Sequence, residues 1–144
     1  MTAFDRAWAL LKMPVVPESI VWNKNRIDGT YADRKTGEEM PIFGVFGNDW
    51  RNIRGGIGSN DSPLASMRAW THGGEQWNAH EAFTEPSHRR RGYSKELYDF
   101  VAMYLEGAGG YLLPDEEQTH YAEEMWKKYA PDGVWPSNRI GGRE

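Results

Sequence analysis

The chain has no cysteine and no long apolar run. Without cysteine there is no disulfide framework, thiolate metal site or cysteine nucleophile, so any acyl transfer would have to be direct. No segment approaches the ~20 apolar residues of a membrane helix, and residues 1–5 lack the features of a secretion signal. These absences predict a cytoplasmic protein with no membrane partner.

An excess of positive charge is also missing. The 144 residues include 17 Lys and Arg against 21 Asp and Glu, which gives a formal net charge of −4. A general nucleic-acid binder is expected to carry a broad basic field, so nucleic acid is not an expected partner. The four histidines share no ligand spacing, and no metal site is expected. The length suits a single domain over residues 1–144.

What the sequence does contain is a basic turn, Glu85-Pro-Ser-His-Arg-Arg-Arg-Gly-Tyr-Ser94. Residues 76–84 before it alternate in the manner of a strand, and apolar residues after it recur at helical spacing. Pro86 ends the strand, and Gly92 lets the backbone pass close to a ligand. The free N–H groups of the first helical turn, with three arginines beside them, suit a diphosphate.

The pattern Pro86-x-x-Arg89-x-x-Gly92-x-Ser94 resembles the acetyl-CoA pyrophosphate loop of the GNAT superfamily of acyltransferases. In that family the last position is Gly or Ala, so the Ser94 side chain would either crowd the phosphate or hydrogen-bond to it. The order downstream supports the resemblance: the helix ends near residues 107–110, and a short apolar run follows at 111–113.

A second helix is expected to open at Pro114, with Asp115 and Gln118 in a capping arrangement. The segment 114–126 is similar to that of small GNAT-like proteins of bacteria and their phages, which implies a phage protein. The resemblance covers about residues 76–130, the cofactor half, and leaves residues 1–75 as the acceptor-side half.

The resemblance implies an α+β fold with α/β/α layers, in which helices flank a mixed, mostly antiparallel sheet. Family members add two strands after the second helix, whereas the fifteen residues after Tyr129 can hardly form such a pair. We therefore expect a shortened C-terminal end. Either the sheet is truncated there or a partner chain covers its open edge, and we expect a homodimer.

Other elements follow from local patterns. Residues 2–13 are predicted to form a short helix that Pro14 and Pro17 end. Strands are predicted at 19–22, 27–32, 40–46, 64–71 and 76–84, the last two joined by a tight turn. Residues 48–63 are rich in Gly, Asn and Asp, and they are predicted to form a long surface loop.

By position in the family pattern, acetyl-CoA is the implied acyl donor. Backbone groups of one strand would bind the pantetheine arm and polarise the thioester, backbone N–H groups of the loop would hold the pyrophosphate, and two arginines would add charge-assisted bonds. The strand residues are Ala82, Phe83 and Thr84; the loop residues are Arg90, Arg91, Gly92, Tyr93 and Ser94; the charged contacts come from Arg89 and Arg91; and Gln118 would reach the pantetheine.

An amine acceptor must lose a proton before it attacks. A lysine of pKa ~10.4 has about one neutral molecule in ~2,500 at pH 7, a deficit of about 4.6 kcal/mol. His80 and Glu81 are the candidate general bases, and as neighbours in a strand they would point to opposite faces. Glu81 is preferred because Trp77, Ala79 and Phe83 share its face, where burial would raise its pKa and make it a stronger base.

The departing thiolate is protonated in many family members by a tyrosine at the position of Trp126, which an indole cannot replace. Tyr121 and Tyr129 are the candidate substitutes, or the thiolate leaves unaided. Two functions therefore stay open. One is an N-acetyltransferase acting on a primary amine, either a protein lysine or N-terminus or a small amine. The other is a catalytically weak or inactive phage protein that binds and inhibits a host protein.

Overall fold

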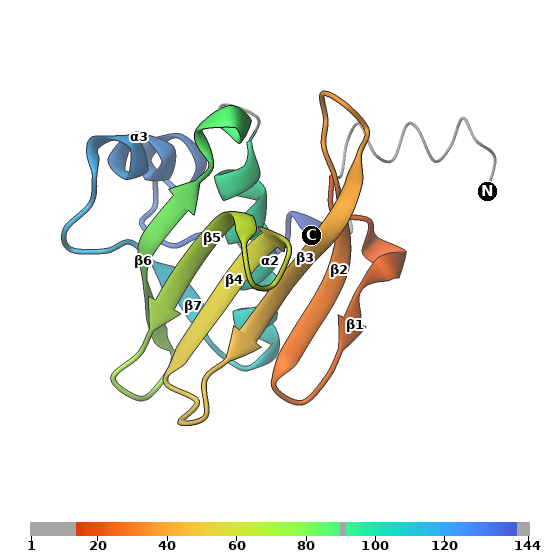
Figure 1. Cartoon of the computed structure of the whole chain (residues 1–144). Coiled ribbons are helices and arrows are strands. Elements are labelled where there is room, and N and C mark those ends of the chain that lie inside the picture. Colours follow the sequence, from red (N-terminus) through yellow and green to blue (C-terminus); the bar gives the residue numbers. More distant parts are fainter. Residues whose placement is uncertain (1–13, 90–91, 141–144) are drawn as a thin grey trace.

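The computed structural model describes residues 14–89 and 92–140 (Figure 1). This part of the chain has a mixed α+β fold in which seven strands form one sheet in sequence order. Neighbouring strands are antiparallel except the last pair, which is parallel. The strands are β1 (Val21–Trp22), β2 (Arg26–Ala32), β3 (Glu39–Phe46), β4 (Asn52–Gly58), β5 (Pro63–Trp70), β6 (Gln76–Thr84) and β7 (Tyr111–Leu113), and the helices are η1 (Pro17–Ser19), η2 (Pro86–His88), α2 (Tyr93–Gly107) and α3 (His120–Tyr129).

Helix α2 covers one face of the sheet and forms the core with it. Leu97, Phe100 and Val101 of the helix are fully buried against the inward residues of β2 to β7. Helix α3 lies beyond the edge of β6, at the upper left of Figure 1. The helix predicted within residues 2–13 lies outside the described residues, so the third layer of the predicted α/β/α arrangement stays a prediction.

Strand β4 corrects the prediction of a long loop over residues 48–63. A Cβ added at Gly55 would lie 2.8 Å from the Val101 side chain of α2, and one at Gly56 would lie 2.5 Å from the Phe43 ring on the other face. These two glycines therefore allow close packing on both faces of a central strand, although glycine is usually depleted in strands. The prediction was wrong because it took packing glycines for turn glycines.

The second helix begins later than predicted. Thr119 is its N-cap, and its Oγ1 accepts a hydrogen bond from the Ala122 N–H at 3.1 Å. Asp115 instead accepts from the Glu117 N–H, at 3.1 Å, in a turn before the helix. The prediction of an opening at Pro114 was therefore wrong. The strand predicted at 19–22 is also shorter, because residues 17–19 form a 3₁₀ turn.

The segment after α3 folds back onto β7 and α2. The Trp135 backbone N–H donates to the Leu112 carbonyl at 3.0 Å, and its Nε1 donates to Oδ1 of Asp99 at 2.8 Å. Arg139 also contacts this buried carboxylate, at 3.3 Å. Residues 130–140 form no strand. Within the described ranges, no helix is both long and apolar enough to span a bilayer.

Candidate functional site

The outer edge of β6 is open over more than half of its length. β7 pairs with β6 only through Gln76, Trp77 and Asn78. Beyond Asn78 no described strand pairs with this edge, and α3 stands across the gap (Figure 1). Two adjoining cavities of about 440 and 110 Å³ lie along the open edge and share Ala82, Thr119 and Ala122 in their walls.

A β-bulge at Glu81 changes which residues of β6 face the core. Arg68 of β5 pairs with His80 but Ser66 pairs with Phe83, so one residue of β5 lies opposite two of β6. Glu81 has φ 54°, a left-handed conformation that non-glycine residues rarely adopt. The alternation expected from a regular strand therefore fails from residue 81 onward.

The predicted surroundings of Glu81 are wrong for this reason. Its side chain is 64% exposed and forms a 3.4 Å ion pair with Nε of Arg68. Phe83 is 43% exposed and does not share the buried face of Trp77 and Ala79. The bulge also corrects the expectation that His80 and Glu81 diverge, because both line the smaller cavity.

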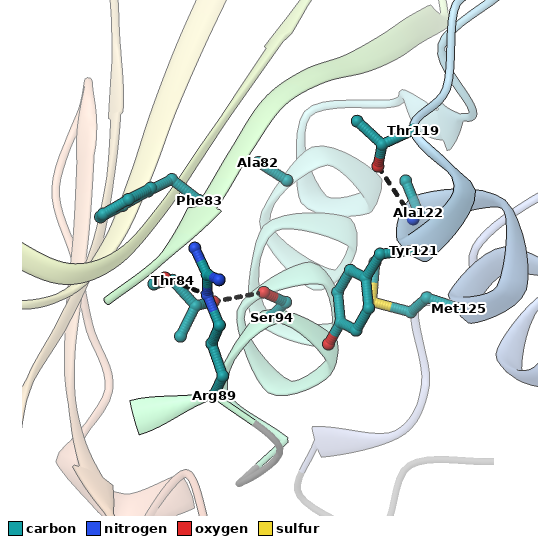
Figure 2. A pocket seen from close by; sticks show the side chains of 9 residues that line it. All are labelled: Ala82, Phe83, Thr84, Arg89, Ser94, Thr119, Tyr121, Ala122 and Met125. Carbon is teal, nitrogen blue, oxygen red and sulfur yellow. Dashed lines mark hydrogen bonds between the residues drawn. The ribbon is translucent and has the colours of Figure 1, made fainter. Parts of the chain in front are cut away.

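The larger cavity gathers residues of the predicted cofactor site (Figure 2). Ala82, Phe83 and Thr84 come from the end of β6, Arg89 from the turn after η2, and Ser94 from the first turn of α2. Residues of α3 and its cap complete the wall, namely Thr119, Tyr121, Ala122 and Met125.

Two hydrogen bonds connect three residues that line this cavity. The hydroxyls of Thr84 and Ser94 lie 2.7 Å apart, and Nε of Arg89 donates to the Thr84 carbonyl at 3.1 Å. Both contacts are drawn in Figure 2. Ser94 is buried, at 6% exposure, and its hydroxyl contacts Thr84. The Ser94 side chain therefore links the strand to the helix and does not project into the turn.

Gly92 sets the direction in which α2 begins. It is the N-cap residue with φ 80°, which an L side chain rarely adopts, although a Cβ there would meet nothing within 4 Å. Gly92 offers no side-chain cap to the helix, and the N-terminus of a helix favours an anion. Arg90 and Arg91 of the predicted site lie outside the described residues.

Of the remaining predicted residues, some line a cavity and others do not. Tyr93 is buried and donates its hydroxyl to Asp33 at 2.5 Å, so its side chain belongs to the core. Gln118 lines the smaller cavity from the segment before α3. Tyr121 is 62% exposed and lines the larger cavity. Tyr129 lines neither cavity and packs near Trp135.

Tyr98 is a candidate that the sequence did not reveal. It comes from α2 and lines the smaller cavity together with His80 and Glu81. Its ring packs edge-on against Trp126 and Trp135, at 5.8 and 4.9 Å between centroids. Burial raises the pKa of the Tyr98 phenol well above its ordinary value, so the hydroxyl stays protonated and able to donate. The position of Tyr98 in the helix is typical of a core residue, and Tyr98 does pack in the core.

The two cavities differ in charge. Among the described residues, the larger cavity is lined by the Arg89 guanidinium and by no carboxylate, whereas the smaller one is lined by Glu81, Asp115 and Glu117. An anionic group is therefore favoured at the turn and a cationic group at the other end. In comparisons with known proteins, no family model and no curated protein matches this chain.

Proposed function

We propose that this protein is an N-acyltransferase of the GNAT type, which moves an acetyl group from acetyl-CoA to a primary amine. The observation that carries the proposal is the open edge of β6 beside the first turn of α2. There Thr84, Arg89 and Ser94 border one cavity, and the free backbone groups of β6 face α3. The strand edge suits an amide-bearing arm, and the helix N-terminus suits a diphosphate.

The proposed transfer is direct. The amine nitrogen attacks the thioester carbonyl carbon, so a C–N bond forms while the C–S bond breaks. One amine proton passes to a base and the departing thiolate gains a proton. Glu81 is the proposed base, since its carboxylate is exposed and borders the smaller cavity, and His80 in the same wall is the alternative. Tyr98 and Tyr121 are the available phenols.

Acetyl-CoA titration by calorimetry tests the cofactor site. The double variant Arg89→Glu/Gly92→Trp reverses the charge at the turn and places a large side chain at the start of α2. The matched control is Arg51→Glu/Gly37→Trp. Gly37 also has positive φ and open space around it, and Arg51 is exposed away from both cavities. Micromolar binding that only the first variant loses is expected.

A second candidate function is a binding module that inhibits a host protein. Trp126 favours it, because this residue is 5% exposed and packed between aromatic rings, so it supplies no proton to a leaving thiolate. No binding at millimolar acetyl-CoA would contradict the transferase. Growth inhibition of a bacterial host that survives the Arg89→Glu/Gly92→Trp change would then support the binding module.

A further inference from the structure

A third cavity, separate from the candidate transferase site, lies at the opposite end of α2. The larger site cavity includes Ser94 at the start of this helix, whereas the third one includes Gly107 and Ala108 at its end. The β3–β4 and β5–β6 connections also reach this end, at the bottom of Figure 1. Its volume of about 420 Å³ is within the range of small-molecule sites.

Five of the ten residues that line this cavity are aromatic, and we call it the aromatic basin. Phe46 is central: its ring lies 5.3 Å from Trp50, 5.6 Å from Trp77 and 5.0 Å from Tyr104 between centroids. Trp22 extends the cluster, 5.5 Å from Tyr104. The remaining lining residues are Asn23, Lys24, Gly74, Gly107 and Ala108.

The two outer tryptophans are not core residues. Trp22 is 48% exposed and Trp50 is 46% exposed, although the fold buries most other large aromatic side chains. Aromatic rings held open to solvent on a rigid frame provide contact area at a low cost in side-chain entropy. The basin therefore presents stacking surfaces that the fold itself does not use.

Trp50 also occupies a backbone position that favours glycine. Its φ is 60°, and its N–H closes a turn onto the Gly47 carbonyl at 3.0 Å. A bulky residue in this conformation costs roughly 1 kcal/mol relative to glycine. Within the described ranges, the other non-glycine residue with positive φ is Glu81, which borders the candidate site. Such strain is typical of positions where the side chain has a role.

The charge along the wall decides what kind of ligand suits the basin. Lys24 is the charged residue among the described lining, and Asp49 beside Trp50 is engaged by the Arg51 N–H and the Asn52 amide. The basin therefore has a net positive charge, which favours an acidic group on its ligand. We propose that the aromatic basin is a second binding site, for a planar aromatic ligand that carries an acidic group.

Binding of indole-3-acetate, followed through the indole N–H signals of the protein by NMR, tests this proposal. Saturable shifts are expected at Trp22, Trp50 and Trp77. Tryptamine has the same ring with a positive charge, and cyclohexylacetate has the carboxylate without an aromatic ring. Both should bind at least roughly fivefold more weakly, as the loss of about 1 kcal/mol implies. Equal binding of either probe, or no saturable shift, would overturn the proposal.

Three variants keep the result interpretable. Trp50→Gly removes one wall but relieves the backbone, so binding should be lost while the protein stays folded. Lys24→Gln should weaken indole-3-acetate and strengthen tryptamine, because the variant removes the charge that attracts the acid and repels the amine. Trp70→Ala is the matched control, since Trp70 is 38% exposed on the opposite face of the sheet and does not line the basin. If Trp70→Ala lost binding of indole-3-acetate while Trp50→Gly kept it, the assignment of the ligand to the aromatic basin would be contradicted.

Discussion

The hydroxyls of Thr84 and Ser94 lie 2.7 Å apart and join the last residue of β6 to the first turn of α2. This contact spans the basic turn, so the strand edge and the helix N-terminus hold a fixed relation to each other. Both residues border the larger cavity. The shape of that cavity therefore depends on a hydrogen bond between two small side chains.

Thr84→Val and Ser94→Ala should each lower the free energy of unfolding by about 1 kcal/mol, the usual net value of such a bond. Because the two hydroxyls bond to each other, the double variant should cost little more than either single one. Urea denaturation of the four proteins in a double-mutant cycle measures this coupling. Fully additive losses would show that the hydroxyls act independently.

Glu81→Gly should stabilise the protein and slow the proposed acetyl transfer. Glycine adopts φ 54° without strain, which is worth about 1 kcal/mol, and the exposed pair with Arg68 contributes little. Glu81→Gln keeps the strained backbone and removes the charge. We expect Glu81→Gln to slow transfer without the gain in stability. A lower unfolding free energy for Glu81→Gly would contradict the account of strain.

Glu96 should make stability depend on pH. Burial raises the pKa of this carboxyl above 4.5, its ordinary value, while Lys95 and Arg34 oppose the shift. The folded state then holds the proton more tightly than the unfolded state. Stability associated with Glu96 is present below pH 4.5 and is lost as pH rises through the folded pKa.

The variant Glu96→Gln does not titrate and isolates this effect. Its unfolding free energy relative to wild type should rise between pH 4.5 and pH 7.5, as measured by urea denaturation at each pH. Glu18→Gln serves as the control at an exposed position. A difference between Glu96→Gln and wild type that stays constant over this range would argue against the pH dependence.

Asp99 should be the most sensitive charged position of the core. Its carboxylate is 1% exposed, accepts from Trp135, and lies 2.7 Å from Nζ of Lys95 and 3.3 Å from Arg139. Asp99→Ala removes the acceptor of the Trp135 indole and one of the partners of Lys95 and of Arg139, and it should cost about 3 kcal/mol. Glu123→Gln breaks an exposed pair with Lys127 and should leave the urea midpoint unchanged. Similar effects of the two changes would contradict the role of burial.

Local patterns predicted the parts of the fold that obey regular alternation. The strands predicted at 27–32, 40–46 and 76–84 are confirmed, because apolar residues recur at period two, in the last strand as far as Ala79, and a clear turn lies beside each. β4 was missed because Gly55 and Gly56 make room for the side chains of Val101 and Phe43. Those two residues are distant in sequence, so a local pattern does not reveal the contact. The start of α3 was misplaced because Asp115 and Thr119 are both good capping residues.

The candidate site was predicted in its main-chain outline and less well in its side chains. Ala82, Phe83, Thr84, Arg89 and Ser94 border one cavity, as the strand, turn and helix order led us to expect. The bulge at Glu81 has no local sequence signal, since glycine would ordinarily mark such a conformation. For the same reason the shared wall of His80 and Glu81 could not be predicted.

The open edge of β6 has a consequence for the behaviour of the protein at high concentration. A row of unpaired strand groups can template the addition of another chain, and β7 leaves the part of this edge beyond Asn78 unpaired. The positive φ at Glu81 interrupts the repeat of those groups, and α3 restricts access to them. The bulge at Glu81, which shapes the candidate site, therefore also disfavours the addition of further strands to this edge.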